Sequence, residues 1–161
     1  NDHGIQFTAT ELNDGRILVA GGGHSETVEG TEVAPPNPVS NSDIYDQSSG
    51  AWSSAANMLN PEVGHTATLL SDGKVLLVGP VATQIYDPAA DSWSDAGQLS
   101  IQRGAPMIGG PADAFHTATL MNDNKVVIVG GVTLELNKFG ALNDREPIST
   151  IDIYNPATGW K

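Results

Sequence analysis

Two histidines of this chain occupy equivalent positions, and imidazole is the side chain whose charge most readily changes near neutral pH. His65 and His116 each begin a run that reads His-Thr-Ala-Thr-Leu. Such rings can act as general bases or as metal ligands. They can equally donate a hydrogen bond to the backbone of a neighbouring element. The sequence leaves both interpretations open.

A second group of candidate ligands lies between positions 24 and 32, where His24 is followed by Glu26, Glu29 and Glu32. Carboxylate oxygens are the ligands that Ca²⁺ prefers, so a calcium site is one interpretation. The spacing matches no known calcium loop, and a solvated acidic loop is the other interpretation. No other cofactor is predicted.

Arginine is scarce in the chain, and two of its three copies lie in loop-like segments, at Arg103 and Arg145. A guanidinium there could pair with a carboxylate or with an acidic ligand. The candidate ligand-binding residues are therefore His24, His65, Arg103, His116 and Arg145. No catalytic residue is predicted, because the sequence has no nucleophile elbow and no glycine-rich phosphate loop.

Composition excludes several functions. The chain has no cysteine, which removes disulfides, thiolate metal sites and cysteine nucleophiles. Its formal net charge of −12 repels phosphate backbones and anionic membranes, so neither nucleic acid nor membrane insertion is expected. The acidic surface is compatible with a protein or glycan partner. An extracellular or cell-surface location is predicted.

One block of residues occurs three times, and it must position these side chains. The clearest copy begins at His65, turns at Asp72-Gly73, continues through the aliphatic run 75–78, and ends with Tyr86 and Trp93. The other copies run from Thr8 to Trp52 and from His116 to Trp160. A repeat of about 50 residues with four strand-like runs predicts a four-stranded β-propeller blade.

Each run has an expected place within its blade. The His-Thr-Ala-Thr-Leu run is predicted to form the innermost strand, and the Asp-Gly turn after it suits a glycine at positive φ. The unbroken aliphatic run predicts a strand buried on both faces. The repeated tyrosines and tryptophans are expected to be buried anchors wedged against the adjacent blade: Tyr45, Trp52, Tyr86, Trp93, Tyr154 and Trp160.

Three connections between the predicted strands contain insertions, at about 23–43, 97–113 and 132–150. In a four-stranded antiparallel blade, the connection between the second and third strands and the connection to the next blade emerge on the same face. All three insertions are therefore expected on one side of the disc, with tight turns on the other. Because loops carry most binding chemistry on rigid scaffolds, this face is the predicted binding surface. Neutral drift in tolerant loops is the alternative.

The repeats predict an all-β chain with one propeller segment over 1–161, made of blades at about 6–56, 57–97 and 111–161. Closed propellers have roughly four to eight blades, so three blades form an arc with unpaired faces. The chain is expected to be either a fragment of a longer propeller or a homo-oligomer, without a stable isolated monomer.

The Gly-Gly, Tyr and Trp order, with an Asp-Gly turn before it, resembles the Kelch repeat family of secreted bacterial proteins. The chain departs from the pattern at Pro80, which follows Gly79 in place of a second glycine, and at Phe7, where the other copies have histidine. The resemblance implies a propeller of six or seven blades. It implies no single activity, since the fold hosts many.

The repeats are also similar to those of galactose oxidase and glyoxal oxidase, which implies a copper-radical enzyme as one alternative. In those enzymes a Tyr-His pair at the start of such a strand ligates copper, and a cysteine cross-links a second tyrosine. Here the pairs are Gly64-His65 and Phe115-His116, without the tyrosine. A sialic-acid mutarotase on a Kelch ring is a further alternative. The leading prediction is a non-catalytic binding or assembly module.

Overall fold

The chain folds entirely into β-strands and turns. A computed structural model describes residues 2–24, 27–28, 31–32, 37–80, 82–103, 116–136 and 142–161. No helix occurs among these residues, which confirms the predicted all-β class. The described residues therefore include no helix long and apolar enough to cross a membrane.

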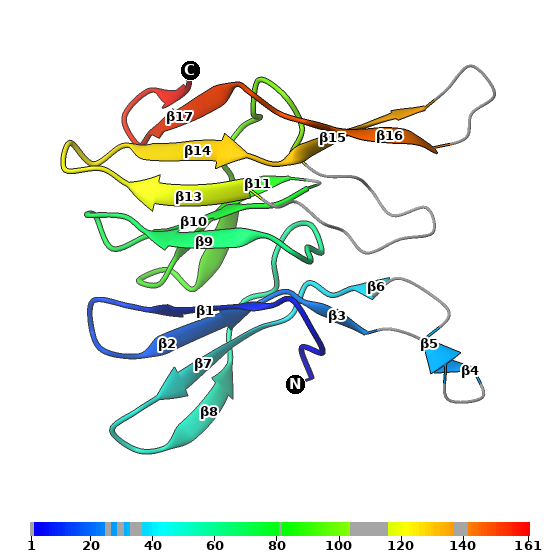
Figure 1. The fold of residues 1–161 in the computed structure, drawn as a ribbon. Coiled ribbons are helices and arrows are strands. Elements are labelled where there is room, and N and C mark those ends of the chain that lie inside the picture. The colour runs from blue at the N-terminus through cyan, green and yellow to red at the C-terminus, as the bar shows by residue number, and fades with distance from the viewer. Residues whose placement is uncertain are drawn as a thin grey trace.

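Three four-stranded antiparallel sheets account for the three sequence repeats (Figure 1). The first sheet has the order β1-β2-β7-β8, the second β9-β10-β11-β12 and the third β13-β14-β17-β18. The first contains β1 (Thr8–Glu11), β2 (Ile17–Ala20), β7 (Ser42–Asp46) and β8 (Ala51–Ser54). The second contains β9 (Thr66–Leu69), β10 (Val75–Val78), β11 (Thr83–Asp87) and β12 (Ser92–Asp95). The third contains β13 (His116–Leu120), β14 (Val126–Gly130), β17 (Ile151–Asn155) and β18 (Gly159–Trp160).

The innermost strands β1, β9 and β13 lie side by side, with β9 in contact with both of the others. They carry alternating threonine and alanine, and such small side chains let the three sheets approach one another along this line. The sheets therefore fan out from a common line (Figure 1).

Tight turns join the first two strands of every sheet. Gly15 and Gly73 have φ of 83° and 86°, and Asn124 has φ of 63° at the equivalent place in the third sheet. Glycine adopts positive φ without steric cost, and asparagine is among the residues that tolerate it best. The predicted turn chemistry is confirmed.

Short hairpins extend from the other ends of the sheets (Figure 1). Between β2 and β7, the strand β3 (Gly23–His24) pairs with β6 (Asn37–Pro38), and β4 (Thr27–Val28) pairs with β5 (Thr31–Glu32), as two separate two-stranded sheets. Between β14 and β17, the strand β15 (Val132–Leu136) pairs with β16 (Leu142–Pro147) in a third two-stranded sheet. Figure 1 shows these hairpins on one side of the molecule and the tight turns on the other. The predicted placement of the insertions 23–43 and 132–150 is thus seen in their described parts.

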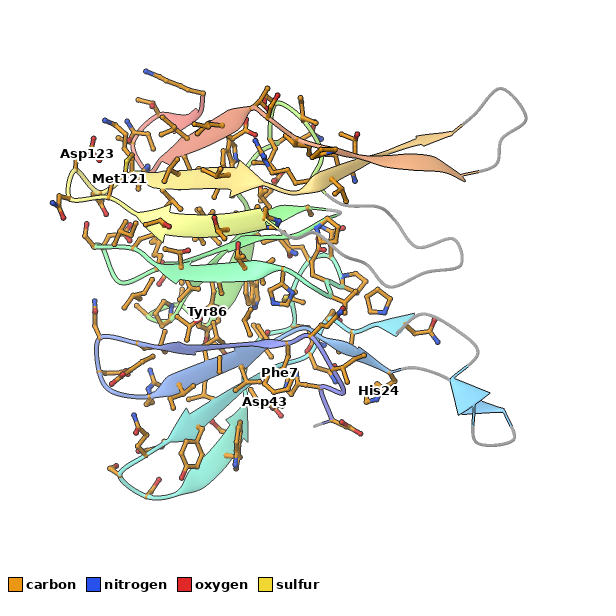
Figure 2. All side chains as sticks on the ribbon, in the orientation of Figure 1. Phe7, His24, Asp43, Tyr86, Met121 and Asp123 are labelled. Atoms are coloured by element: carbon orange, nitrogen blue, oxygen red, sulfur yellow. The ribbon has the colours of Figure 1, made fainter. Side chains whose placement is uncertain are left out.

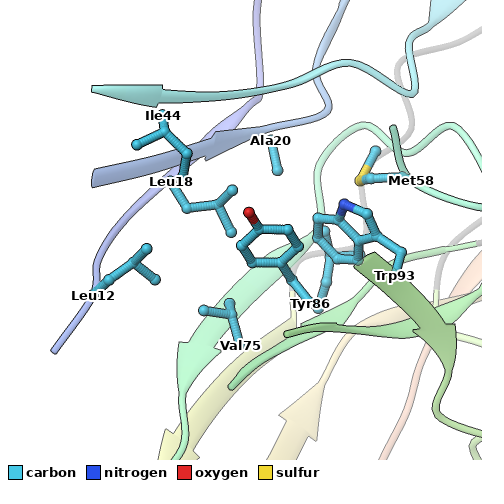
Figure 3. Close-up of a cluster of buried hydrophobic side chains, with 9 residues drawn as sticks. Leu12, Leu18, Ala20, Ile44, Met58, Val75, Tyr86 and Trp93 are labelled. Carbon is cyan, nitrogen blue, oxygen red and sulfur yellow. The ribbon is translucent and has the colours of Figure 1, made fainter. Parts of the chain in front are cut away.

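Tyrosine and tryptophan form the junctions between sheets. Tyr86 lies opposite Trp93 across β11 and β12, with ring centroids 5.2 Å apart. Figure 3 shows both rings packed among side chains of the first sheet, including Leu18 and Ile44. Tyr154 and Trp160 pack in the same manner against Leu76, Val78 and other residues of the second sheet.

The first sheet breaks this pattern. Tyr45 and Trp52 also pair across their strands, but Trp52 is 61% exposed, whereas Trp93 is only 7% exposed. The expectation that every repeat tryptophan is buried is wrong for Trp52, because none of the described sheets covers that side. The strand β10, by contrast, is fully buried on both faces, as its unbroken aliphatic run predicts.

Candidate functional site

A buried polar residue occupies the same position in all three sheets, directly before the Ile-Tyr pair of the third strand. These residues are Asp43, Gln84 and Asp152. Gln84 accepts hydrogen bonds from the backbone N–H groups of Leu59 and Asn60 through its Oε1, at 2.8 and 3.1 Å. Both donors lie in the segment that leads into the second sheet. The position therefore fastens each incoming segment to its sheet.

Arg103 provides the attachment at Asp152. It is 0% exposed, and its Nε and Nη2 donate to the Asp152 carboxylate at 3.1 and 2.6 Å. Its remaining donors reach the carbonyl oxygens of Gly130 and Thr150, at 2.5 and 2.9 Å. The guanidinium is therefore committed to contacts inside the protein.

The carboxylate partner is held ionised by its surroundings. Burial raises the pKa of Asp152, but hydrogen bonds from Ser100 and Arg103 outweigh that effect and bring the pKa below its ordinary value. An ionised carboxylate and a guanidinium at this separation form a buried, hydrogen-bonded ion pair.

Equivalent attachments in the other two sheets use different chemistry. Glu62 is buried, and its Oε1 accepts from the backbone N–H of Ala82 at 2.6 Å, with its carboxylate packed directly against Gly79. His3 is buried with Nδ1 at 2.8 Å from the Gly21 carbonyl and Nε2 at 2.9 Å from the Asp43 carboxylate. Sequence reasoning missed both residues. Their distances to the following repeat differ, so no spacing reveals that they are equivalent to Arg103.

His65 and His116 bridge neighbouring sheets. His116 Nε2 lies 3.0 Å from Thr66 Oγ1 and 3.1 Å from the Val78 carbonyl oxygen, both in the second sheet. His65 Nε2 lies 2.9 Å from Thr8 Oγ1 in the first sheet. Since a carbonyl can only accept, His116 Nε2 donates to the backbone of the neighbouring sheet, which is the second of the two interpretations of this residue.

Burial makes both rings hard to protonate. Desolvation lowers the pKa of each to about 4, and the hydrogen bonds to backbone carbonyls offset this only in part. Both histidines are therefore neutral at neutral pH. Their Nδ1 atoms are buried without a hydrogen-bond partner among the described residues.

The remaining candidates are His24, Arg145 and the three glutamates of the acidic segment. His24 is half-buried, and its Nε2 is 3.2 Å from the Asp2 carbonyl oxygen (Figure 2). Glu26 and Glu29 lie outside the described residues. Glu32 and Arg145 belong to β5 and β16, which are described as strands without their side chains. The calcium interpretation stays a prediction.

A cleft of about 240 Å³ opens between the β10–β11 connection and the segment after β12. The described residues that line it are uncharged: Gly79, Pro80, Ala82, Thr83, Gly97, Gln98, Leu99 and Gln102. Gln102 Nε2 donates to the Pro80 carbonyl across the cleft at 2.6 Å. Amide and backbone groups of this kind suit a neutral polar ligand better than an ion.

The described residues do not fit the copper centre that the oxidase resemblance implies. They contain no group of three or more histidine, cysteine, aspartate or glutamate side chains able to hold a metal. The Nε2 atoms of His65 and His116 are engaged between sheets, and the chain has no cysteine for the cross-link.

Comparison with known proteins gives a structural relative and no sequence relative. No family model matches the chain, and no curated protein matches it. A solved structure described as a novel fungal alcohol oxidase of the AA5 family, in complex with copper, matches with a TM-score of 0.62 and 17% identity. The match covers 97% of this chain and 29% of the oxidase chain. Likeness at this identity concerns the fold, so the three sheets have the fold of consecutive β-propeller blades, over about 29% of the length of that structure.

Proposed function

We propose that the chain is a non-catalytic binding and assembly module of the propeller type. It takes a protein or a glycan on the face that carries the loops 23–43, 97–113 and 132–150. The observation that carries this proposal is that three of the polar candidates have structural contacts, whereas the projecting hairpins leave one side of the scaffold available for binding. His65, Arg103 and His116 are buried and hold sheets and linkers together, while the hairpins extend from one side of the scaffold.

The ligand chemistry follows from charge and from the cleft. A net charge of −12 favours neutral or basic partners over nucleic acid. The uncharged cleft beside Gln98 and Gln102 favours a neutral glycan or the backbone of a peptide. On this proposal Arg145 and His24 contribute from the flanking loops, Ca²⁺ is an optional ligand of the acidic segment, and the module works outside the cell.

Removing the β15–β16 hairpin tests the binding face. We expect a variant in which an Asn-Gly turn replaces residues 133–146 to lose affinity for its ligand by about tenfold or more, because the projecting contacts are gone. The third sheet should still fold, since Val132 already lies opposite Pro147 and Ile148 donates to Gly131. A neutral glycan array, probed with and without CaCl₂, provides the measurement.

Asp123→Ala is the matched control for the hairpin variant, because Asp123 is exposed at a tight turn on the opposite side (Figure 2). It should leave every array signal unchanged. Equal signals from the hairpin variant and the parent chain, with both folded, would contradict the choice of face.

A second candidate function is that of a segment of a Kelch-propeller enzyme, of the copper-radical oxidase or sialic-acid mutarotase type. The fold match to an alcohol oxidase over 97% of this chain favours it. Since the described residues offer no copper site, we expect the chain to bind no stoichiometric copper and to release no hydrogen peroxide from alcohols. Copper titration and a coupled peroxidase assay, with an NMR assay of sialic-acid anomer exchange, check both enzyme types. Activity in either assay would replace the binding proposal.

A further inference from the structure

Each end of the three-sheet stack has a face that no other described sheet covers. On the first sheet, Trp52 is 61% exposed and Phe7 47% exposed. On the third sheet, Val129 is 43% exposed and Ile151 58% exposed. Large apolar side chains rarely gather in water on both ends of a fold without a partner.

The two internal junctions show what such faces bind. At the first, the Tyr86–Trp93 pair packs on an aliphatic surface of the preceding sheet, made of Leu12, Leu18, Ala20 and Ile44. At the second, the Tyr154–Trp160 pair packs on the equivalent surface, made of Leu70, Leu76, Val78 and Ile85. Each junction therefore consists of an aromatic pair from one sheet that packs against four aliphatic side chains of the preceding sheet.

The uncovered ends supply the two halves of a third junction. The repeat places Met121, Val127, Val129 and Ile153 in the third sheet where the aliphatic surfaces lie in the first two. All four are apolar. On the first sheet, the rings of Tyr45 and Trp52 lie 5.0 Å apart at 41°, against 5.2 Å and 43° for the buried Tyr86–Trp93 pair. The aromatic half is therefore already in its packed geometry.

The departure from the repeat at Phe7 is consistent with the same junction. Where His116 reaches the carbonyl of Val78, the first repeat has Phe7, which cannot donate. The residue equivalent to Val78 in the third sheet is the exposed Val129. An exposed ring would thus meet an exposed aliphatic side chain, and both would leave water.

Charge at the rim agrees with this arrangement. Arg16 and Lys74 lie at equivalent turns, and each interacts electrostatically with the tyrosine of the following sheet, Tyr86 and Tyr154. Lys125 occupies that turn in the third sheet. In a third junction it would approach Tyr45 and the exposed side of Asp46, which places a cation beside an anion.

We propose that two copies of this chain associate head to tail, with the Tyr45–Trp52 face of each packed on the Val127–Val129–Ile153 face of the other. Both ends are then covered in a closed ring of six sheets related by a two-fold axis, a number within the range of closed propellers. This inference stands independently of the ligand proposed for the hairpin face.

Sedimentation velocity and light scattering of the 161-residue chain test the proposal. The expected mass is twice the chain mass of 16.8 kDa. Trp52→Lys and Val129→Glu should each convert the protein to a folded monomer, because each places a charge in one half of the junction. Both side chains are exposed in a single copy, so far-UV circular dichroism should remain that of the parent. Leu59→Glu, at an exposed apolar residue of a linker, is the control and should keep the two-copy mass.

Mixing the two monomeric variants distinguishes head-to-tail pairing from face-to-face pairing. The mixture contains one intact junction and one junction in which the new lysine meets the new glutamate, so the two-copy mass should return. Face-to-face pairing predicts no such recovery. A parent chain that is monomeric at all concentrations, that forms open polymers, or whose two-copy mass survives both substitutions would overturn the proposal.

Discussion

An Arg103→Ala variant is expected to lose about 3–5 kcal/mol of its free energy of unfolding, because a buried Asp152 carboxylate is left without its partner. The guanidinium makes four hydrogen bonds, two to Asp152 and two to the backbone carbonyls of Gly130 and Thr150. Urea denaturation followed by tryptophan fluorescence measures the loss, with parent and variant at the same protein concentration so that association contributes equally to both.

Arg16→Ala is the matched control, because Arg16 pairs with Asp14 in an exposed ion pair with an Nη2-to-Oδ2 distance of 2.8 Å. Removing an exposed pair of this kind costs about 0–1 kcal/mol. Arg103→Lys should recover only part of the loss, since an ammonium cannot reproduce the two-pronged contact with Asp152. If Arg103→Ala cost no more than Arg16→Ala, the buried attachment would have no energetic importance.

Acidification from pH 7 to pH 4 is expected to lower the free energy of unfolding by about 3 kcal/mol for each of His65 and His116. Desolvation lowers the pKa of both rings to about 4 in the folded chain, against 6.5 for an exposed histidine. The unfolded state therefore binds protons first as the pH falls. Stability is complete above pH 6.5 and decreases between pH 6.5 and pH 4.

Carboxylates contribute below this window. Hydrogen bonds from Ser48 to Asp46, and from Lys125 to Asp123, lower the pKa of those two groups, so their contribution is lost only as the pH falls further. Urea unfolding at a series of pH values isolates the histidine part.

His65→Gln and His116→Gln keep an N–H donor and remove the titration. Each should reduce the pH dependence between pH 6.5 and pH 4 by up to about 1.4 kcal/mol per pH unit, the equivalent of one proton. An unchanged slope in both variants would show that the rings titrate normally in the folded chain.

Repetition made the scaffold predictable. The spacing of seven residues from Tyr86 to Trp93 places the two rings opposite each other across a hairpin, as found. The Asp-Gly turns indicated the positive φ at Gly15 and Gly73. Each of these features depends on residues close in sequence, so the pattern itself contains the geometry.

The attachments between linkers and sheets were not predictable in the same way. Arg103 was interpreted as a ligand-binding residue because it lies in an insertion, yet it pairs with Asp152, 49 positions along the chain. Glu62 lies three residues before His65, while Arg103 lies 13 before His116, so no common spacing connects them. Trp52 shows a second limit of prediction from the sequence. The repeat identifies which side chains are suited to packing, but only the arrangement of the sheets shows whether a neighbour covers them.

The unequal chemistry of the buried attachments also bears on how this chain avoids folding in the wrong order. Repeats this similar risk an exchange in which one linker docks on another repeat. A linker carrying Glu62 that docked at Asp152 would oppose two buried carboxylates, and one carrying Arg103 that docked at Gln84 would bury a cation beside a neutral amide. Both of these exchanges, between the second and third repeats, leave an uncompensated charge in the interior. The variation at these positions therefore disfavours an exchange of linkers between the second and third repeats.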